Sequence, residues 1–355
     1  MAIDLRSDTV TRPTEAMTEA IRRAELGDDG REGDPTVRRL EALAAEVTGK
    51  EAGLFVVSGT MGNLIALLAH TGRGGEVLLE QNSHIIRSEM GGVASIASLF
   101  FKGLPGKRGA MDIEALKDAI SPGLSHNRLA TGLICMETTH NDAGGAALPL
   151  EHMEAVAEVA RANRIPVHTD GARLFNAAVR LGVPAKRVAE HTDTLNFCVS
   201  KGLSAPIGSL LVGPKSFIDR ARAFRRMVGG NLRQGGVAAA AGIVALEQMT
   251  ERVAEDHRIA RLIAEGLHRI DPAFLDPAEV ETNIVQVDTR ASGRRAAEWV
   301  DALRSLGVLS GVWSPWRLRL VTHRHIGEAD AAATVRAFAE LHGRFGGATP
   351  RHAAE

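Results

Sequence analysis

The stretch D-T-L-N-F-C-V-S-K-G-L-S-A-P-I-G-S-L-L-V, from Asp193 to Val212, decides the fold prediction. Two apolar runs, Leu195 to Val199 and Ile207 to Val212, predict β-strands on either side of a turn that contains Lys201. A lysine at the end of a buried strand is a ready amine nucleophile, because losing its proton relieves the cost of desolvating the ammonium. The alternative is a surface lysine in an ordinary turn, and this stretch alone leaves both interpretations open.

On both sides of this stretch, apolar runs of strand length alternate with helical patterns. The predicted strands are Leu54 to Val57, Val77 to Glu80, Leu133 to Glu137, Pro166 to Thr169, Leu195 to Val199 and Ser209 to Val212. The helical patterns include Met61 to Leu68, Asp112 to Ile120, Leu150 to Asn163 and Ala172 to Leu181. This alternation favours an α/β fold in which helices cover both faces of a mostly parallel sheet. Ligands of such sheets bind at the carboxyl ends of the strands, where polar clusters of this chain fall.

The length of 355 residues predicts two domains, since single cores stop growing at roughly 250 to 300 residues. We expect a large domain with an N-terminal arm over residues 1–245 and a small C-terminal α+β domain over residues 246–345. The boundary falls in a long helical region from Val237 to about Arg269, and residues 346–355 read as a tail.

The composition excludes several classes of protein. Lys plus Arg number 42 and Asp plus Glu 43, so nothing points to nucleic acid as a partner. The N-terminus lacks an apolar run and no apolar stretch is long enough to span a bilayer, so we expect a cytoplasmic protein without a membrane segment. Cys135 and Cys198 lie in apolar runs and are expected to be buried thiols. The chain contains no Tyr, so a phenol is not available for catalysis.

Three clusters at predicted strand ends could bind a ligand. The small residues from Ser58 to Asn63 could bring the N–H groups of a helix N-terminus to a phosphate, although a plain tight turn is the more common explanation of such a stretch. Asp170 needs a cationic partner, which is either Arg173 or a ligand. His84 alone is more often a satisfied polar residue than a catalyst. No metal site is expected, since no H-E-x-x-H-type ligand spacing accompanies the H-x-D and H-x-H pairs.

Taken together, these residues are the components of a pyridoxal phosphate site. Lys201 would form a Schiff base with the cofactor, and Asp170 would keep the pyridine nitrogen protonated so that the ring accepts electrons. A flat side chain such as His84 would cover the ring. Each signal is weak alone, and their order along successive strand ends is what favours this interpretation.

With these residues identified, the chain resembles the low-specificity L-threonine aldolases, pyridoxal-phosphate enzymes of the aspartate-aminotransferase fold (fold type I). The resemblance covers essentially the whole chain. The matching motifs are D-L-R-S-D-T-V-T-R-P at the start, G-D-P-T-V around Asp34, S-G-T-M-G-N, S-H-I, E-M-G-G from Glu89, T-H-N-D-A-G-G from Thr139, D-G-A-R-L-F-N-A, S-K-G-L-S-A-P-I-G-S, L-R-Q-G-G from Leu232 and R-L-V-T-H from Arg319.

The resemblance implies a role for each matching residue. Lys201 would hold the cofactor covalently, Asp170 would pair with the pyridinium nitrogen, and His84 would stack on the ring near the β-hydroxyl. Gly59 and Thr60 would bind the phosphate, with Arg233 reaching it from a neighbouring subunit. The amino-acid carboxylate would be bound by Ser7, Arg173 and Arg319, with Arg173 alternatively contacting the cofactor. A less certain second imidazole from the adjacent subunit is His126, and the assembly would be a homodimer or homotetramer with shared active sites.

The implied reaction is the retro-aldol cleavage of the Cα–Cβ bond of L-threonine, L-allo-threonine and related β-hydroxy-α-amino acids to glycine and an aldehyde. The alternatives are β-elimination or racemisation on the same scaffold, or a pyridoxal-phosphate- or amino-acid-binding protein without turnover. One departure concerns the substrate: Arg31 stands nearest to where the family commonly has a Tyr, and Arg87 to Glu89 lacks the aromatic residue often found before the Glu. We expect an altered pocket on the aldehyde side, so that threonine need not be the preferred substrate.

Overall fold

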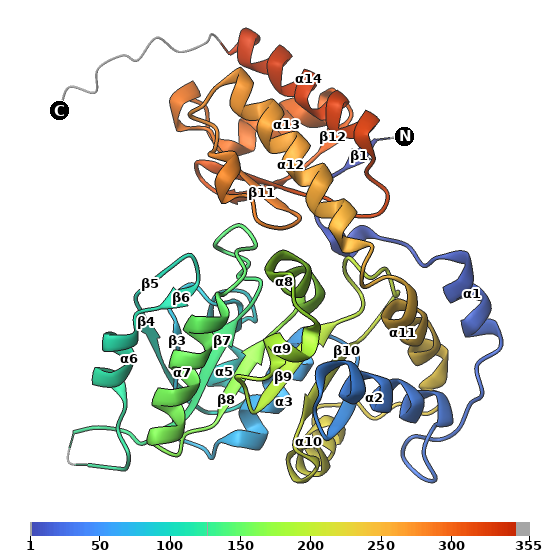
Figure 1. Ribbon diagram of the computed structural model, residues 1–355, viewed down its shortest axis with the longest axis vertical. Helices are drawn as coiled ribbons and strands as arrows, with labels where there is room; N and C mark the ends of the chain where they lie inside the picture. The colour runs from blue at the N-terminus through green and yellow to red at the C-terminus, as the bar shows by residue number, and fades with distance from the viewer. Residues whose placement is uncertain (1, 126, 346–355) are drawn as a thin grey trace. The chain divides into compact units, whose positions relative to one another are not determined.

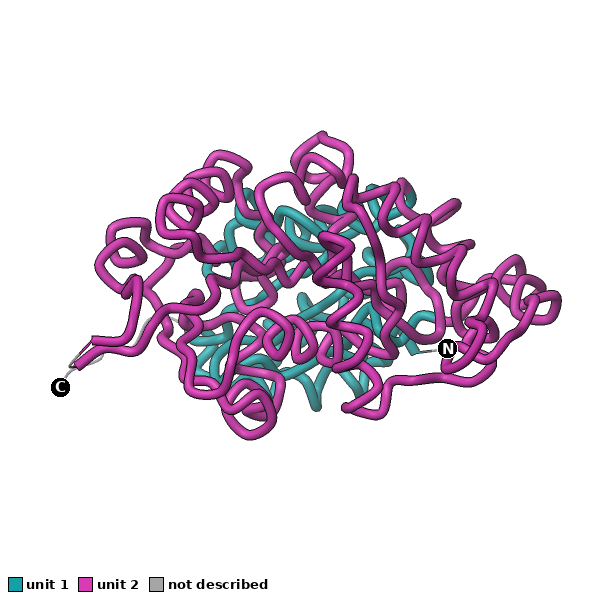
Figure 2. The backbone as a smooth tube through the Cα atoms, turned by 90° about the horizontal axis from the view of Figure 1, so that it is seen from below, with its two compact units in different colours: residues 1–11, 252–355 teal, residues 12–251 magenta. Residues whose placement is uncertain are grey.

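The computed structural model describes residues 2–125 and 127–345, and it divides into two compact units. Unit 1 combines residues 1–11 with residues 252–355, and unit 2 is formed by residues 12–251 (Figure 2). The sequence had assigned the N-terminal arm to the large domain and the boundary to residue 245. The first residues instead pair within unit 1, where β1 (Ile3–Asp4) runs parallel to β12 (Val308–Leu309). The expected tail, residues 346–355, lies outside the described residues.

Unit 2 is built on a seven-stranded sheet with the strand order β2-β10-β9-β8-β7-β3-β4 (Figure 1). Strand β10 is antiparallel to β9 and β2, and all other neighbours are parallel. The strands are β2 (Ala52–Val56), β3 (Glu76–Glu80), β4 (Phe100–Leu104), β7 (Thr131–Glu137), β8 (Val167–Asp170), β9 (Thr194–Cys198) and β10 (Ser209–Gly213), with β5 (Gly106–Lys107) and β6 (Ala110–Met111) as a small separate pair. The predicted mostly parallel α/β sheet is confirmed.

Helices cover both faces of this sheet because its central strands are apolar on both sides. On one face, Ile65 and Ala69 pack with Phe217 against Leu54 and Leu211. The helices of unit 2 are α1 (Glu15–Arg22), α2 (Pro35–Thr48), α3 (Gly59–His70), α4 (His84–Arg87), α5 (Gly92–Ser95), α6 (Ile113–Ala119), α7 (Leu150–Ala162), α8 (Leu174–Leu181), α9 (Ala185–Ala189), α10 (Lys215–Met227) and α11 (Gly236–Gln248).

Unit 1 is an α+β unit around one aromatic core. Trp299 stacks on Phe338 and meets Phe274 edge to face, and all three side chains are buried. Its main sheet has the antiparallel order β11-β14-β13. Besides β1 and β12, its elements are η1 (Asp8–Val10), α12 (Val253–Ile270), η2 (Pro277–Glu279), β11 (Ile284–Asp288), η3 (Arg290–Ser292), α13 (Ala296–Ser305), β13 (Gly311–Ser314), β14 (Arg317–Val321) and α14 (Glu328–Arg344).

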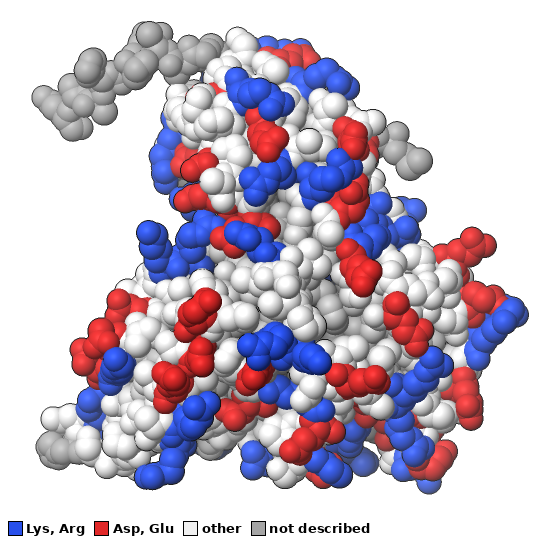
Figure 3. Space-filling model, viewed as in Figure 1, with Lys and Arg blue, Asp and Glu red and all other residues white. Residues whose placement is uncertain are grey.

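The helical region predicted from Val237 to Arg269 is two helices, α11 and α12, separated at residues 249–252. No Gly or Pro marks the break, so the sequence pattern did not reveal it. Within the described part of the chain, no helix is long and apolar enough to cross a membrane. Basic and acidic side chains are interspersed over the face drawn in Figure 3.

Candidate active site

The parallel strands of unit 2 end at one edge of the sheet, and the predicted site residues of unit 2 largely follow these ends. Strand β2 lies antiparallel to β10, which lies antiparallel to β9, so β2 points the same way as β9, β8, β7 and β3. At this edge Glu137 pairs in register with Asp170, and Asp170 with Asn196. Polar side chains from three neighbouring strands therefore stand side by side, as the parallel sheet requires.

Asp170 is the last residue of β8 and is 2% exposed. Its Oδ1 accepts a hydrogen bond of 3.1 Å from the N–H of Ala172, and its Oδ2 accepts one of 2.9 Å from Nδ2 of Asn63. These bonds fix the direction of the carboxylate. Both donors are uncharged, so they do not neutralise it.

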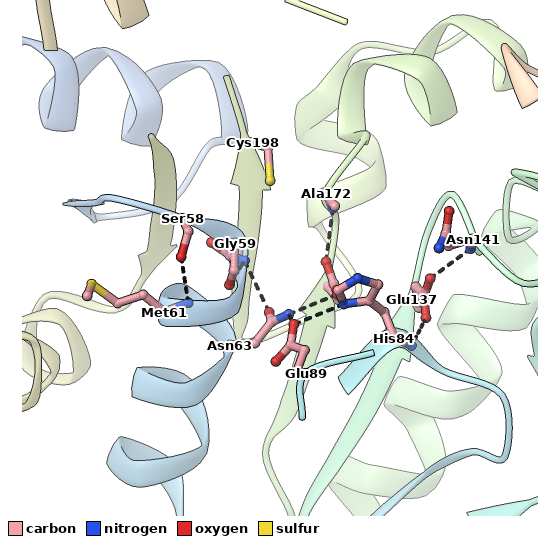
Figure 4. A network of polar contacts seen from close by, with 12 residues as sticks. Ser58, Gly59, Met61, Asn63, His84, Glu89, Glu137, Asn141, Ala172 and Cys198 are labelled. Atoms are coloured by element: carbon pink, nitrogen blue, oxygen red, sulfur yellow. Dashed lines mark hydrogen bonds and ion pairs between the residues drawn. The ribbon is translucent and has the colours of Figure 1, made fainter. Parts of the chain in front are cut away.

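Asn63 on α3 links Asp170 to a second carboxylate (Figure 4). Its Nδ2 also donates to Oε1 of Glu89 at 2.8 Å, and its Oδ1 faces Nδ2 of Asn196 at 3.1 Å and Nε2 of His168 at 3.2 Å. The opposite amide orientation would turn the oxygen towards two carboxylates, so the network fixes the side chain in one orientation.

His84 begins α4 and contacts two buried glutamates (Figure 4). Its Nδ1 lies 3.0 Å from Oε1 of Glu89, and its backbone N–H donates to Oε2 of Glu137 at 2.6 Å. Burial lowers the pKa of His84, but the hydrogen bond to Glu89 and the charges of Asp170, Glu89 and Glu137 outweigh burial and raise it. Burial raises the pKa of Glu89, and the charge of Asp170 raises it further. The pair therefore retains a proton more readily than either group would in water.

The N-terminus of α3 provides hydrogen-bond donors at the same edge. Ser58 caps this helix by accepting a hydrogen bond from the N–H of Met61 at 3.2 Å. None of the described residues accepts from the N–H groups of Gly59 and Thr60, and Thr60 is exposed. A Cβ at Gly59 would lie 3.0 Å from Sγ of Cys198, so the position suits glycine. These N–H groups are of the kind that can receive an anion, and their binding of a phosphate stays a prediction.

Lys201 lies in the loop between β9 and β10, two strands that form an antiparallel pair. The loop is held by hydrogen bonds from Ser204 N–H to the carbonyl oxygen of Lys201 at 2.8 Å and from Ala205 N–H to that of Val199 at 3.0 Å. Lys201 is half-buried, which lies between the two interpretations that its stretch of sequence left open. Because the loop leaves the carboxyl end of β9, it begins at the same edge as Asp170.

Of the other predicted residues, two lie in unit 2. Arg173 is buried at the N-cap position of α8, in the short connection that follows Asp170 at the end of β8. Arg233 has a side chain that is 65% exposed and lies 3.5 Å from Oδ1 of Asp28. Arg31, which replaces the family's Tyr, is also exposed and lies 3.7 Å from Asp28. His126 lies outside the described residues.

Ser7 and Arg319 belong to unit 1. Oγ of Ser7 accepts hydrogen bonds from both N–H and Oγ1 of Thr9, at 3.2 and 2.8 Å, which leaves its own hydroxyl hydrogen as a donor. The guanidinium of Arg319 lies over the ring of Trp313, 4.6 Å from its centroid.

A buried His–Glu cluster adjoins the site and was not foreseen. Nε2 of His140 lies 3.0 Å from Glu80 and 3.7 Å from Glu137, while its Nδ1 accepts from the N–H of Ala143 at 3.3 Å. Burial lowers the pKa of His140, but the charges of Glu137 and Glu80 outweigh it and raise the pKa. The second oxygen of Glu137 accepts from the N–H of Asn141 at 2.7 Å.

The sequence also missed the roles of Asn63, Glu89 and Glu137. Asn63 and Glu89 stood in quoted motifs, but only the folded chain brings them to Asp170. One nitrogen or oxygen atom from each of His84, Glu89 and Asp170 lies within 4.8 Å of the others, a grouping compact enough for a metal ion. The hydrogen bonds of Asn63 to Glu89 and Asp170, and the contact of His84 with Glu89, join these atoms in one hydrogen-bonded network.

Comparison with known proteins gives concordant results. The beta-eliminating lyase family matches residues 4–290. A probable low-specificity L-threonine aldolase 2 of Arabidopsis thaliana is 43% identical, covering 96% of this chain and 97% of the relative, and the low specificity L-threonine aldolase of Escherichia coli (strain K12) is 41% identical, covering 95% and 99%. A threonine aldolase structure from Leishmania major superposes with a TM-score of 0.81 at 16% identity, covering 96% of this chain and 99% of that one. At this low sequence identity, the superposition supports a shared fold and nothing further.

Proposed function

We propose that this chain, which belongs to the beta-eliminating lyase family among the low-specificity L-threonine aldolases, cleaves L-threonine, L-allo-threonine and related β-hydroxy-α-amino acids to glycine and an aldehyde. The observation that carries the proposal is the full-length similarity to aldolases, together with the buried carboxylate, helix N-terminus and lysine loop at one edge of the sheet. The cofactor is pyridoxal phosphate.

The residues present fit this cofactor. The buried carboxylate of Asp170 is held by uncharged donors and can pair with a pyridinium nitrogen. The N–H groups of Gly59 and Thr60 have no acceptor among the described residues and can hold a phosphate group. Lys201 supplies the primary amine for covalent attachment. When bound, pyridoxal phosphate supplies an electron sink for the bond that breaks at Cα of the amino acid.

His84 is the proposed base in the cleavage. A group that takes the β-hydroxyl proton must be unprotonated before the step, and it must hold the proton afterwards. An imidazole whose Nδ1 faces Glu89 has its Nε2 available for that proton. The raised pKa of His84 makes its unprotonated form a stronger base.

The substrate carboxylate needs cationic or hydroxyl donors. We propose Arg173 within unit 2, where its backbone is fixed at the start of α8. The expected roles of Ser7 and Arg319 rest on the family resemblance, as does the alternative that Arg173 contacts the cofactor. The hydroxyl hydrogen of Ser7 is compatible with its role as a donor.

We further propose a cytoplasmic homodimer or homotetramer. In support, several large apolar side chains of unit 2 are exposed, among them Met90 at 96%, Met227 at 72% and Phe100 at 58%. Burying such side chains stabilises an association between subunits. Contributions of Arg233 and His126 to a neighbouring subunit's site are part of this proposal. Light scattering after size-exclusion chromatography tests the oligomer, and a monomer at all concentrations contradicts it.

The decisive experiment is a substrate panel with product identification. Purified protein loaded with pyridoxal phosphate is incubated with threonine, allo-threonine, serine, β-phenylserine and β-hydroxyaspartate, and glycine and aldehyde are quantified. Equal amounts of glycine and aldehyde are expected. The panel includes an acidic side chain because Arg31 replaces the family's Tyr. Formation of a keto acid or a D-amino acid without aldehyde would favour β-elimination or racemisation, and a coloured protein without any product would indicate a binding protein.

A further inference from the structure

The contact between His84 and Glu89 goes beyond the residues that the proposed function requires. Glu89 is 7% exposed and lies in the segment between α4 and α5, five residues after His84. Its Oε1 faces Nδ1 of His84 at 3.0 Å. Glu89 is therefore placed to act on the imidazole from the side opposite to the proposed proton acceptor, Nε2.

Glu89 is itself fixed by Asn63. The same Oε1 accepts a hydrogen bond of 2.8 Å from Nδ2 of Asn63, whose second hydrogen goes to Asp170 at 2.9 Å. One amide group thus holds two buried carboxylates that would otherwise repel each other. The amide cannot rotate without losing its contacts to Asn196 and His168.

The direction of the His84 hydrogen bond follows from this arrangement. Oε1 of Glu89 already accepts from Asn63, and an ionised carboxylate has no hydrogen to give. With Glu89 ionised, Nδ1 of His84 is the donor. The neutral imidazole carries its hydrogen on Nδ1 and presents the lone pair of Nε2, which is the form that a base needs.

We propose that Glu89, held by Asn63, is the positioning residue for His84: it fixes the Nδ1–H tautomer and stabilises the imidazolium that forms when Nε2 takes a proton. The role of His84 as base rests on the proposed function, but the pairing of His84 with Glu89 does not. The charged groups that face His84 are Glu89 itself, Asp170 from β8 and Glu137 from β7. Their joint effect raises the pKa of His84, in agreement with this role.

The test compares Glu89→Gln with Glu89→Ala. Glutamine can keep an oxygen facing Asn63 and His84, so it preserves the tautomer and removes only the charge. Alanine removes both the charge and the oxygen that accepts from His84. As a matched control, Glu80→Gln removes the charge from another buried glutamate that pairs with a different histidine, His140. The holoenzymes are labelled with 15N-histidine, and the His84 signal is assigned by its absence in His84→Asn.

The NMR titration is expected to show the Nδ1–H tautomer of His84 in the wild type, with its midpoint lowered in Glu89→Gln and with mixed tautomers in Glu89→Ala. Glu80→Gln should leave the His84 tautomer unchanged. An Nε2–H tautomer in the wild type, or a midpoint in Glu89→Gln equal to that of the wild type, would overturn the proposal.

The kinetic test uses the same variants. Because Glu89 acts through His84, kcat is expected to fall about 10-fold in Glu89→Gln and about 100-fold in Glu89→Ala, within the usual contribution of general-base catalysis, while KM changes little. The acid limb of kcat/KM should move to lower pH in Glu89→Gln. If the wild type releases no aldehyde, the proposed function fails, yet the NMR titration still decides the role of Glu89.

Discussion

Glu137 holds the backbone of His84, because its Oε2 accepts a 2.6 Å hydrogen bond from the N–H of His84. Its other oxygen accepts a 2.7 Å bond from the N–H of Asn141. A single carboxylate at the end of β7 therefore fixes the first residue of α4 and the loop that follows β7 itself. Burial is the main cause that raises the pKa of Glu137.

Replacing Glu137 is expected to destabilise unit 2. In Glu137→Ala, two backbone N–H groups lose their acceptor, at a cost of about 1–3 kcal/mol for each that stays unsatisfied. Glu137→Gln retains one acceptor oxygen, so its free energy of unfolding should fall by roughly half as much. Urea unfolding measures both, with the 79% exposed Glu114→Gln as a control expected within about 0.5 kcal/mol of the wild type. A Glu137→Ala protein as stable as the wild type would contradict this account.

Lys201→Ala is expected to abolish both the covalent attachment of pyridoxal phosphate and aldehyde release. The amine of Lys201 is the nucleophile in the proposed site, and the alanine side chain has no amine to replace it. Borohydride reduction of the wild type followed by peptide mapping should find the cofactor on Lys201. Lys215→Ala, whose side chain is 71% exposed, should keep both properties. A reduced adduct on a different lysine would refute the assignment.

His84→Ala should retain the cofactor and lose most of the cleavage activity. Loss of a general base lowers kcat by about 10²- to 10⁴-fold, whereas the phosphate and ring-nitrogen contacts do not involve this side chain. Absorption of the bound cofactor and aldehyde release measure the two properties separately. His152→Ala on α7 is the control, since α7 is not among the elements that carry the proposed site. Unchanged cleavage in His84→Ala would mean that another group is the base.

The buried His168 predicts a loss of stability in mild acid. Burial lowers its pKa to about 3, while in the unfolded chain it is protonated near the ordinary value of 6.5. Between these values the unfolded state binds a proton that the folded state does not. The free energy of unfolding therefore falls as the pH is lowered through this window, by about 1.4 kcal/mol per pH unit for this residue.

His168→Gln removes this proton uptake, so its unfolding free energy should depend less steeply on pH between pH 6 and pH 5 than that of the wild type. The slope is the measured quantity, because the substitution also lowers stability at every pH. His191→Gln, in the half-buried loop before β9, controls for the loss of one histidine. Equal slopes for the wild type and His168→Gln would rule out the explanation.

The sequence predicted the strands of the central sheet well because they are short apolar runs bounded by polar turns. The predicted Val77 to Glu80 and Ser209 to Val212 differ from β3 and β10 by one residue each. The edge strand β4 was missed, since its sequence F-F-K-G-L is interrupted by Lys and Gly and does not alternate, and four of its five residues are exposed. The helix α1 was missed for a similar reason, since Met17 is its one buried residue.

The candidate site could be predicted only in part. Residues at or shortly after strand ends, such as Asp170 and Lys201, follow from the strand pattern, because parallel strands bring their carboxyl ends together. The contacts of Asn63 could not be foreseen, since Glu89 and Asp170 lie 26 and 107 residues away from it along the chain. Nothing in a local pattern reports a hydrogen bond across such a separation. Both cysteines are buried and free, as predicted.

The pairing of β1 with β12 has a consequence for the order in which the protein can be completed. Ile3 pairs with Val308, so strand β1 cannot form its ladder until the chain has been synthesised as far as Val308. Unit 2, which lies between these segments in the sequence, can reach its native contacts earlier. The segment around Ile3 therefore completes unit 1 only after residues far along the chain are available, and substitutions that block this pairing should slow the folding of unit 1 more than that of unit 2.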